Sequence, residues 1–465
     1  MRVCFIVYDN DAHIHAFPIG IGYLASYLRE LGHEITIYSQ DVYHYPESHL
    51  TDYLTNYEFD VVGVGVIGGY YQYRKLLKIS EAIDKVPKSN RPFYIIGGHG
   101  PAPEPEFFLR KTRADAIVIG EGEIITKNLL DALQSGENLN RVKGLAFFGR
   151  DEKFVMTERE DVIHDLDSFP FPAYDLFPMN HYALLRAPNI EKNERCMPIL
   201  SSRGCPYECN FCYRMDPGYR LRGPEKIVEE MKYLIDEYQI KYFLFQDELT
   251  MVSPKRIEEL CEAFNDAEFH VKWSCNGRLN FAKPSMLKMM KDAGCVFINY
   301  GIESVDDECL RLMNKKLTVE QITTGIENTL AAGISPGLNI IWGNIGENED
   351  TLENGVQFLL KYDDFAQLRT IRPVTPYPGS PLYYYALENG LLKDVEDFYE
   401  NKHVNSDLLS VNFTNIPDDE FHMLLYKANK RLLDNYFQHQ QKRMDETMRK
   451  LYIEKDATFR GYRHS

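Results

Sequence analysis

The sequence lacks a hydrophobic stretch long enough to cross a membrane, because no run of about 18 apolar residues occurs in its 465 residues. The first residues are strand-like and do not form a signal peptide, so we expect a cytoplasmic protein without a membrane span. Positive charge is also scarce: 52 Lys and Arg stand against 69 Asp and Glu, a net charge of -17. This balance opposes attraction to phosphate backbones, so we expect no nucleic-acid partner.

A disulfide framework is absent as well, since the nine cysteines are an odd number spread thinly, with one tight group among them. Low-complexity segments and short repeats are also absent. The composition, with 44% hydrophobic and 26% charged residues, is that of an ordinary folded protein. The chain is about three times as long as a typical domain, which predicts two or three domains. A cysteine-based metal site in a cytosolic protein stays open.

The first 150 residues alternate short apolar runs with segments of helical length. This alternation predicts an α/β fold with a Rossmann-like, doubly wound parallel sheet. The apolar run 61–67 lacks in/out alternation, as expected of a strand that is covered on both faces. The predicted elements are strands at 3–7, 35–38, 61–66, 93–96, 116–119 and 145–148 and, among the helices, 19–31 and 124–133.

Residues 151–194 are predicted to be a linker, because their proline- and aromatic-rich part excludes a long helix or a central strand. The alternation resumes over 195–390, where six β/α units predict a partial TIM-type barrel with functional residues at the carboxyl ends of its strands. Apolar residues at helical spacing then predict a helical C-terminal region, 391–465. The predicted barrel strands are 199–201, 242–245, 272–274, 297–302, 338–342 and 367–371.

The tight cysteine group follows the first predicted barrel strand. Cys205, Cys209 and Cys212 have the spacing C-x3-C-x2-C. Soft thiolates favour iron or zinc, and these short spacings let one loop wrap a metal. Three thiolates on a cubane cluster leave one iron open to a further ligand. A zinc knuckle would need a fourth ligand, and no Cys or His follows closely; structural zinc and inert buried thiols are the alternatives.

With Phe211 as its aromatic residue, this motif resembles the signature of the radical S-adenosylmethionine (SAM) enzymes, and the resemblance covers most of the second region. It implies a [4Fe-4S] cluster on the three cysteines, reductive cleavage of SAM to a 5′-deoxyadenosyl radical, and an external electron donor such as flavodoxin or ferredoxin. The implied SAM contacts are Phe211, Gln246, Asp247, Glu248, Asn276, Arg278, Glu303 and Ser304.

Two later segments bear on the same resemblance. Residues 376–381 resemble the family's P-x-P-G-[ST]-P turn, whereas 343–348 depart from its more usual Pro-Gly-Glu-Thr turn. For Ser304 and Ser380, helix capping is an equally good interpretation.

Glycine-rich turns follow several strands of the N-terminal region, and no G-x-G-x-x-G follows the first strand, which disfavours a dinucleotide. The arrangement is similar to the cobalamin-binding domains that are fused to radical SAM barrels. His13 lies in the loop where other cobalamin domains carry the cobalt-ligating histidine of a D-x-H-x-x-G motif, with a surface or capping histidine as the alternative. The other implied cobalamin contacts are Gly65, Ile67, Gly97, Gly98, His99, Gly120, Glu121 and Gly122.

Together the resemblances imply a cobalamin-dependent radical SAM enzyme that methylates an unactivated carbon of a small molecule or natural-product precursor. The same cofactors serve cyclisation or rearrangement without methyl transfer, as in the anaerobic magnesium-porphyrin cyclase type, and the sequence does not separate the two. A tRNA methylthiotransferase-like enzyme would have further N-terminal cysteines and an RNA-binding C-terminal barrel, which this sequence lacks. A non-catalytic cobalamin-binding sensor is the remaining class. No motif identifies the substrate.

Overall fold

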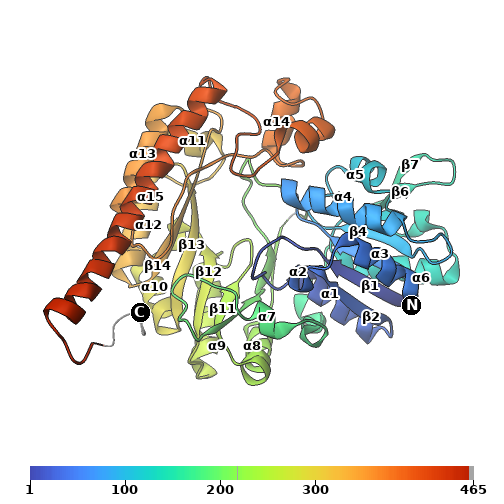
Figure 1. The fold of residues 1–465 in the computed structure, drawn as a ribbon, viewed down its shortest axis with the longest axis horizontal. Helices are drawn as coiled ribbons and strands as arrows, with labels where there is room; N and C mark the ends of the chain where they lie inside the picture. Colours follow the sequence, from blue (N-terminus) through green and yellow to red (C-terminus); the bar gives the residue numbers. More distant parts are fainter. Residues whose placement is uncertain (217, 460–465) are drawn as a thin grey trace.

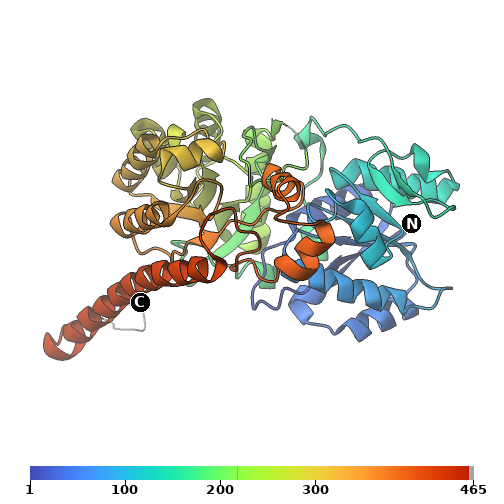
Figure 2. The same cartoon turned by 90° about the horizontal axis from the view of Figure 1, so that it is seen from above.

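The computed structural model describes residues 1–216 and 218–459 of the chain. Figures 1 and 2 show two α/β lobes, an N-terminal lobe in blue and cyan and a second lobe in green and yellow. A long C-terminal helix, in red, lies along the outside of the second lobe and projects beyond it. Over the described residues, no helix combines the length and the apolar character that crossing a membrane requires.

The N-terminal lobe is built on one open sheet. Its strands are β1 (Arg2–Val7), β2 (Glu34–Ser39), β3 (Val61–Gly65), β4 (Phe93–Gly97), β5 (Ala116–Val118), β6 (Leu145–Phe148) and β7 (Phe154–Met156). The strand order is β2-β1-β3-β4-β5-β6-β7, and β1 to β5 pair in parallel. Because β2 and β3 lie on opposite sides of β1, the chain reverses its winding there, which opens a crevice at the carboxyl ends of the strands.

Helices cover both faces of this sheet. They are α1 (Ile19–Glu30), α2 (Gln40–Tyr43), α3 (Glu47–Asn56), α4 (Tyr70–Asp84), α5 (Pro105–Thr112) and α6 (Gly122–Ser135), followed by the short 3-10 turn η1 (Leu139–Arg141). Helices α1 and α6 pack on one face, whereas α3, α4 and α5 pack on the other, and each group encloses its own apolar cluster. Helix α6 ends at Gly136, whose φ of 72° is a left-handed C-cap that favours glycine.

Short elements join the two lobes: η2 (Leu166–Ser168), η3 (Tyr174–Leu176) and α7 (Met179–Tyr182). The ring of Phe17, from the N-terminal lobe, packs against Tyr174, Phe177 and Tyr182, with 4.9 to 5.6 Å between ring centroids. The segment between the lobes is therefore a packed connector, consistent with its lack of a long helix or a central strand.

The second lobe is an open, parallel half-barrel. Its strands are β8 (Arg195–Ile199), β11 (Ile240–Phe245), β12 (Lys272–Gly277), β13 (Cys295–Glu303), β14 (Ser335–Trp342) and β15 (Arg372–Pro373), in the order β8-β11-β12-β13-β14-β15. All of these pairs are parallel, so the carboxyl ends of the strands share one edge. A separate antiparallel hairpin of β9 (Ser202–Gly204) and β10 (Tyr219–Leu221) encloses the cysteine loop.

The outer layer of the half-barrel is helical. It consists of α8 (Pro224–Tyr238), α9 (Pro254–Asp266), α10 (Pro284–Asp292), α11 (Asp307–Leu312), α12 (Val319–Ala331) and α13 (Glu349–Lys361), with the short turn η4 (Leu279–Phe281). Helices α8, α9 and α10 each have proline in the first turn, where the missing N–H costs no hydrogen bond. The core between helices and strands holds Trp273 and Trp342, which are 0% and 1% exposed.

The C-terminal part consists of α14 (Pro381–Glu388), η5 (Asp397–Lys402), α15 (Asp418–Met448) and η6 (Arg449–Ile453). Helix α14 and η5 return to the N-terminal lobe, where the ring of Tyr399 lies 4.7 Å from that of Tyr73. Helix α15 packs along α13 and buries residues at helical spacing, among them Phe421, Leu425 and Leu432. The predicted C-terminal helix is therefore confirmed, and the segment before it joins the two lobes.

The α/β class, the parallel core of the first sheet and the half-barrel are confirmed, but some strands differ from their predictions. Strand β6, predicted as part of the parallel sheet, pairs antiparallel with β5, and β7, which was not predicted, pairs antiparallel with β6 because the turn at 149–153 joins them directly. The first barrel strand is Arg195–Ile199 rather than 199–201. It ends there because the N–H groups of Ser201 and Ser202 donate to the buried carboxylate of Asp247. The last is Arg372–Pro373 rather than 367–371, since Arg369 is held by Asp364 and the carbonyl of Pro336.

We predict that Phe421→Ala destabilises the second lobe. Phe421 is 0% exposed and stacks on Trp342 with 4.2 Å between centroids, so truncation leaves a cavity where α15 meets the barrel. The expected loss is about 3–5 kcal/mol of unfolding free energy. Tryptophan fluorescence during urea unfolding measures it, because both tryptophans, Trp273 and Trp342, lie in this lobe.

Phe437→Ala is the matched control, because this phenylalanine lies on the same helix and is 60% exposed. It should change the unfolding free energy by no more than about 0.5 kcal/mol. Equal shifts for the two variants would contradict the proposed anchoring of α15 through Phe421.

Candidate functional site

A cavity of about 740 Å³ lies between the two lobes, at the carboxyl ends of the N-terminal strands. One wall comes from residues that follow β1, β3, β4 and β5, and the other from the cysteine loop and the residues after β11. Open parallel sheets bind ligands at this edge. Apart from His13, every residue predicted to contact cobalamin lines the cavity: Gly65, Ile67, Gly97, Gly98, His99, Gly120, Glu121 and Gly122.

Glycine shapes this wall for two different reasons. Gly98 has a φ of 100°, and a Cβ there would lie 2.6 Å from the carbonyl oxygen of Val66, so the backbone itself requires glycine. At Gly65 and Gly122 the nearest protein atoms to an added Cβ are 3.7 and 3.8 Å away, so the protein has room for one. Their missing side chains keep the cavity open, and the wall fits a large cofactor that approaches the backbone closely.

The loop after β1 places its two histidines differently. His13 is exposed and does not line the cavity, whereas His15 is buried and does. The loop turns at Asp11, which has a φ of 54° and donates its N–H to the Asp9 carboxylate at 2.7 Å. His15 packs against His181 of α7 with 6.2 Å between rings, and burial lowers the pKa of His15. The surface alternative for His13 is the one that this geometry favours.

The three predicted cluster ligands lie on the loop between β9 and β10. Cys209 is buried, Cys205 is half-buried and Cys212 is exposed. The thiol of Cys212 donates to Cys209 and lowers the pKa of Cys209, a shift that burial opposes and the Lys315 ammonium supports. In the described residues, no three Cys, His, Asp or Glu side chains are already gathered around a metal position. The donor set, three thiols on one loop, is nevertheless the one that iron–sulfur clusters take.

Contacts from several elements hold the cysteine loop. The side chains of Asn210 and Asn344 exchange hydrogen bonds of 3.2 and 3.0 Å, and the N–H of Asn210 donates to the carbonyl of Met313 at 2.9 Å. The guanidinium of Arg278 stacks on the ring of Tyr207, 3.5 Å from its centroid. The loop is therefore tied to the carboxyl ends of β12 and β14 and to the turn after α11.

Three predicted SAM contacts follow β11, and two of them line the cavity. Gln246 and Glu248 are exposed and line it, and Glu248 Oε2 accepts a hydrogen bond from the N–H of Gly204 at 3.0 Å. Asp247 is instead fully buried, and Ser201 donates to it from its N–H at 2.7 Å and from its hydroxyl at 2.5 Å. Both oxygens of Asp247 are thereby engaged in positioning the start of the cysteine loop, and it does not line the cavity.

Glu303, at the end of β13, pairs with Lys315 at 2.9 Å, and each of the two side chains is 10% exposed. The same ammonium lies 5.8 Å from the ring of Phe211. Arg278 donates to backbone carbonyls after α11, but its Nε is buried and has no hydrogen-bond partner in the described residues. Arg278 therefore keeps one unpartnered donor beside the cysteine loop, although it does not line the cavity.

Asn276 belongs to a row of amides on β12, β13 and β14 that the sequence analysis missed. The side-chain N–H of Asn276 donates to the carbonyl of Asp247 at 2.7 Å, and its amide oxygen accepts from Asn299 at 3.0 Å. The amide oxygen of Asn299 in turn accepts from Asn339 at 2.8 Å. Gly337 makes room for this row, because a Cβ there would lie 2.5 Å from the Asn299 amide oxygen. Both amide atoms of Asn276 are therefore engaged within the protein.

Ser304 bonds to a buried carboxyl group rather than capping a helix. The N-cap of α11 is Asp306, and the hydroxyl of Ser304 bonds to Glu347. Glu347 is 5% exposed and accepts a hydrogen bond from the N–H of Asn344 at 3.0 Å; burial raises the pKa of Glu347 to about 8. Ser380, in contrast, is the N-cap of α14, which confirms the capping interpretation for that residue.

An ion-pair network joins the two lobes at the cavity. Arg203 of β9 donates to Glu121 at 3.0 Å and to Glu123 at 2.6 Å, and Arg220 of β10 donates to Glu121 at 2.6 Å. Burial raises the pKa of Glu121, but Arg220 and Arg203 outweigh this effect and lower it overall. Sequence reasoning missed the two arginines; the available signal was that Arg203 lies two residues before Cys205.

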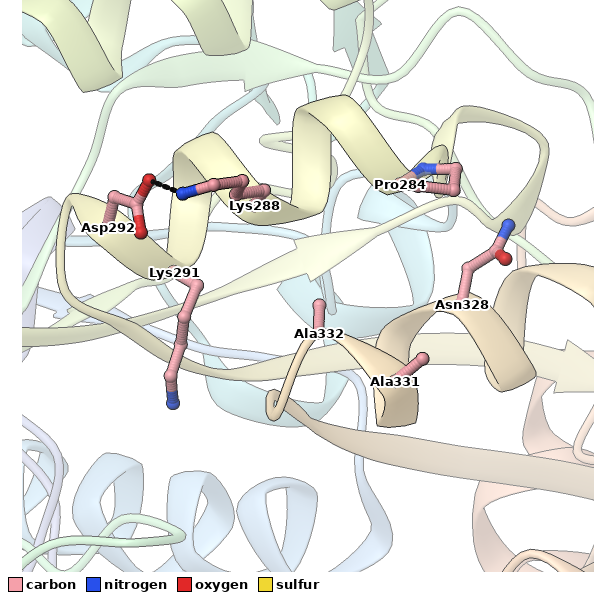
Figure 3. Close-up of a pocket in the computed structure, with 7 residues that line it drawn as sticks. All are labelled: Pro284, Lys288, Lys291, Asp292, Asn328, Ala331 and Ala332. Carbon is pink, nitrogen blue, oxygen red and sulfur yellow. Dashed lines mark hydrogen bonds and ion pairs between the residues drawn. The ribbon is translucent and has the colours of Figure 1, made fainter.

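A second hollow, of about 380 Å³, lies between α10 and α12 on the outer layer of the barrel (Figure 3). In Figure 3, Lys288 pairs with Asp292 on α10 at 2.6 Å. The residues that line this second hollow are Pro284, Lys288, Lys291, Asp292, Asn328, Ala331 and Ala332. None of these is a predicted site residue, so the cavity between the lobes is the candidate functional site.

We predict that Glu347→Gln changes how stability depends on pH. The pKa of Glu347 is about 8 in the folded protein, whereas an unperturbed glutamate has a pKa of about 4.3. The folded state therefore keeps a proton that the unfolded state releases, and the wild type loses stability as pH rises from about 5 to about 8. Relative to it, the E347Q variant gains up to about 1.4 kcal/mol per pH unit, measured by urea unfolding across this range.

Glu58→Gln is the control for this measurement, because the side chain of Glu58 is 93% exposed. Its difference from the wild type should stay flat between pH 5 and pH 8. A difference that stays flat for E347Q as well would mean that the Glu347 carboxyl is ionised in the folded protein.

Two family models match separate parts of the chain. The B12 binding domain matches residues 6–130, in the N-terminal lobe, and the radical SAM superfamily matches residues 199–359, in the half-barrel. Both matched regions line the cavity. The B12-binding region contributes the glycine-rich strand ends, called the glycine wall below, and the radical SAM region contributes the cysteine loop.

Curated relatives cover both lobes. The uncharacterized methyltransferase PH0819 of Pyrococcus horikoshii is 31% identical over 382 residues, which span 81% of this chain and 79% of the relative. The anaerobic magnesium-protoporphyrin IX monomethyl ester cyclase of Rubrivivax gelatinosus is 28% identical over 398 residues, which span 82% of this chain and 69% of the relative. The alignments with both relatives therefore cover most of this chain.

Solved structures share the fold at lower identity. The radical SAM methyltransferase TsrM from Kitasatospora setae, with cobalamin and a [4Fe-4S] cluster bound, superposes with a TM-score of 0.72 at 15% identity, over 93% of this chain and 88% of that one. The cobalamin-dependent radical enzyme OxsB, with aqua-cobalamin and SAM bound, gives 0.67 at 19% identity, over 84% of this chain and 55% of that one. The chain belongs to the cobalamin-dependent radical SAM methyltransferase family, whose cofactors are a [4Fe-4S] cluster, SAM and cobalamin.

Proposed function

We propose that this enzyme transfers a methyl group from SAM to an unactivated carbon of a small molecule or natural-product precursor. The observation that carries the proposal is the single cavity, which is lined by the glycine-rich strand ends on one side and by Cys205 and Glu248 on the other. When bound, the cluster supplies the electron that cleaves SAM, and cobalamin carries the methyl group. Both parts of this chemistry then lie at one cavity between the lobes.

In this proposal Cys205, Cys209 and Cys212 hold the cluster. Glu248 offers a carboxylate in the cavity for the SAM ammonium, and Arg278 offers its unpartnered Nε for the SAM carboxylate. Asp247 acts indirectly, through the backbone of the cysteine loop. The remaining proposed contacts are Phe211, Gln246, Asn276, Glu303 and Ser304 for SAM and Gly65, Ile67, Gly97, Gly98, His99, Gly120, Glu121 and Gly122 for cobalamin.

We also propose that the reducing electron comes from an external donor such as flavodoxin or ferredoxin. The cysteines outside the loop are all buried: Cys4, Cys196, Cys261, Cys275, Cys295 and Cys309. They form no second group of metal-binding side chains in the described part of the chain. Cys212, in contrast, is exposed, so the loop is accessible from the surface.

We predict that Cys209→Ala abolishes cluster assembly and leaves cobalamin binding intact, because the glycine wall belongs to the other lobe. Iron per chain and 5′-deoxyadenosine formation should both fall to background after anaerobic reconstitution. Cys275→Ala is the matched control, since it also removes a buried thiol but lies on β12, outside the cysteine loop. Full iron content in C209A, or loss of iron in C275A, would contradict the ligand assignment.

Methyl transfer is tested by the two products of SAM. Use of SAM as a radical source leaves 5′-deoxyadenosine and methionine, whereas its use as a methyl donor leaves S-adenosylhomocysteine. We predict that the reconstituted enzyme, given SAM, cobalamin and a low-potential reductant, forms both 5′-deoxyadenosine and S-adenosylhomocysteine. Mass spectrometry quantifies them, and protein without cobalamin should form only the first.

Cyclisation or rearrangement is the second candidate function, and the named activity of the Rubrivivax relative favours considering it. Such an enzyme consumes SAM only as a radical source. Formation of 5′-deoxyadenosine without S-adenosylhomocysteine, in protein with a full complement of cobalamin, would therefore overturn the methyl-transfer proposal.

A further inference from the structure

Three consecutive residues, Arg203 and Gly204 of β9 and Cys205 directly after it, connect different parts of the site. Arg203 pairs with Glu121 in the glycine wall, the N–H of Gly204 donates to Glu248 at 3.0 Å, and Cys205 is the first residue of the cluster motif. All of these residues line the cavity. This short segment therefore connects the regions assigned to cobalamin, SAM and the cluster.

The arginine end of this segment is held tightly. Arg203 places its two terminal nitrogens on two different carboxylates, Glu121 and Glu123, whose side chains are only 9% and 6% exposed. Its guanidinium also lies 5.6 Å from the ring of Tyr23 in α1. All of these partners belong to the N-terminal lobe, so the position of Arg203 follows that of the cobalamin domain.

The two strands of the hairpin are paired with each other and reach the same carboxylate. Arg203 of β9 is the ladder partner of Arg220 of β10, and Arg220 reaches the same Glu121 carboxylate at 2.6 Å. Gly204 has a φ of 88°, and a Cβ there would clash with the carbonyl oxygen of Gly218. Only glycine therefore fits at the position whose N–H group holds Glu248, directly after the arginine.

A ligand in the cavity would strengthen this connection. Glu121, Glu123 and Arg203 line the cavity, so water reaches the ion pairs from that side. A cofactor against the glycine wall removes the water, and the attraction between opposite charges rises as the local dielectric falls. The stronger pairs hold the hairpin, and with it the N–H of Gly204, in the position that orients the Glu248 carboxylate.

We propose that the β9–β10 hairpin couples the binding of cobalamin to the binding of SAM, with Arg203 as the positioning residue that transmits the coupling. This inference rests on the proposed placement of SAM at Glu248. Coupling between two sites is reciprocal: if cobalamin tightens the binding of SAM, SAM tightens the binding of cobalamin by the same factor.

The test measures binding of SAM and hydroxocobalamin by equilibrium dialysis to cluster-reconstituted protein, each with and without a saturating amount of the other. In the wild type, each should bind about fivefold tighter or more when the other is present. In Arg203→Met both ratios should fall to about one. Arg203→Lys keeps the charge but not the two-pronged geometry, so its ratios should lie between these values. Arg29→Met, which removes an exposed ion pair with Asp175, should keep the wild-type ratios.

The outcomes separate this inference from the function on which it rests. Unchanged SAM affinity in Glu248→Gln would overturn the placement of SAM itself. Weaker SAM binding in E248Q, together with wild-type ratios in R203M, would overturn the coupling alone, as would ratios of one in the wild type. If R203M does not fold or does not assemble the cluster, Glu121→Gln provides the second test, because it removes the partner charge with little change of shape and should also lower both ratios.

Discussion

The ion-pair network of Arg203, Arg220, Glu121 and Glu123 ties the two lobes together at the edge of the shared cavity. Buried pairs of this kind add little net stability, because the cost of removing charges from water offsets their attraction. Lobes that met in another position would, however, lose the bonds that Arg203 and Arg220 make to the two carboxylates. The network therefore favours the lobe position that forms the shared cavity, and the aromatic packing at Phe17 and Tyr399 supports the same position.

That position makes one site out of two incomplete ones. The N-terminal sheet supplies a glycine-rich wall, and the half-barrel supplies the Cys205 thiol and the Glu248 carboxylate. Each set lies at the carboxyl edge of a parallel sheet, where α/β proteins place their ligands. Apposing the two edges brings both sets of groups to one cavity. Helix α14 and η5, which return from the barrel to pack on the first lobe, reinforce this arrangement.

The sequence predicted what depends on local patterns: the α/β class, most strands, the cysteine spacing and the glycine turns that line the cavity. It did not predict contacts between residues far apart in the chain. Asp247 follows a strand end as a ligand would, yet its oxygens bond to Ser201, 46 residues away. His13 and His15 occupy one loop, yet His13 is exposed and only His15 of the two lines the cavity. Arg203 and Glu121 are 82 residues apart, so no local pattern reveals their pairing.

The central claim is that one cavity, shared by both lobes, binds cobalamin. Hydrogen–deuterium exchange of the cluster-reconstituted protein with and without hydroxocobalamin tests it most directly. The account predicts slower exchange both at the ends of β3 and β4 and in the β9–β10 hairpin of the other lobe, around Gly204. Protection confined to the N-terminal lobe, with exchange in the hairpin unchanged, would contradict it.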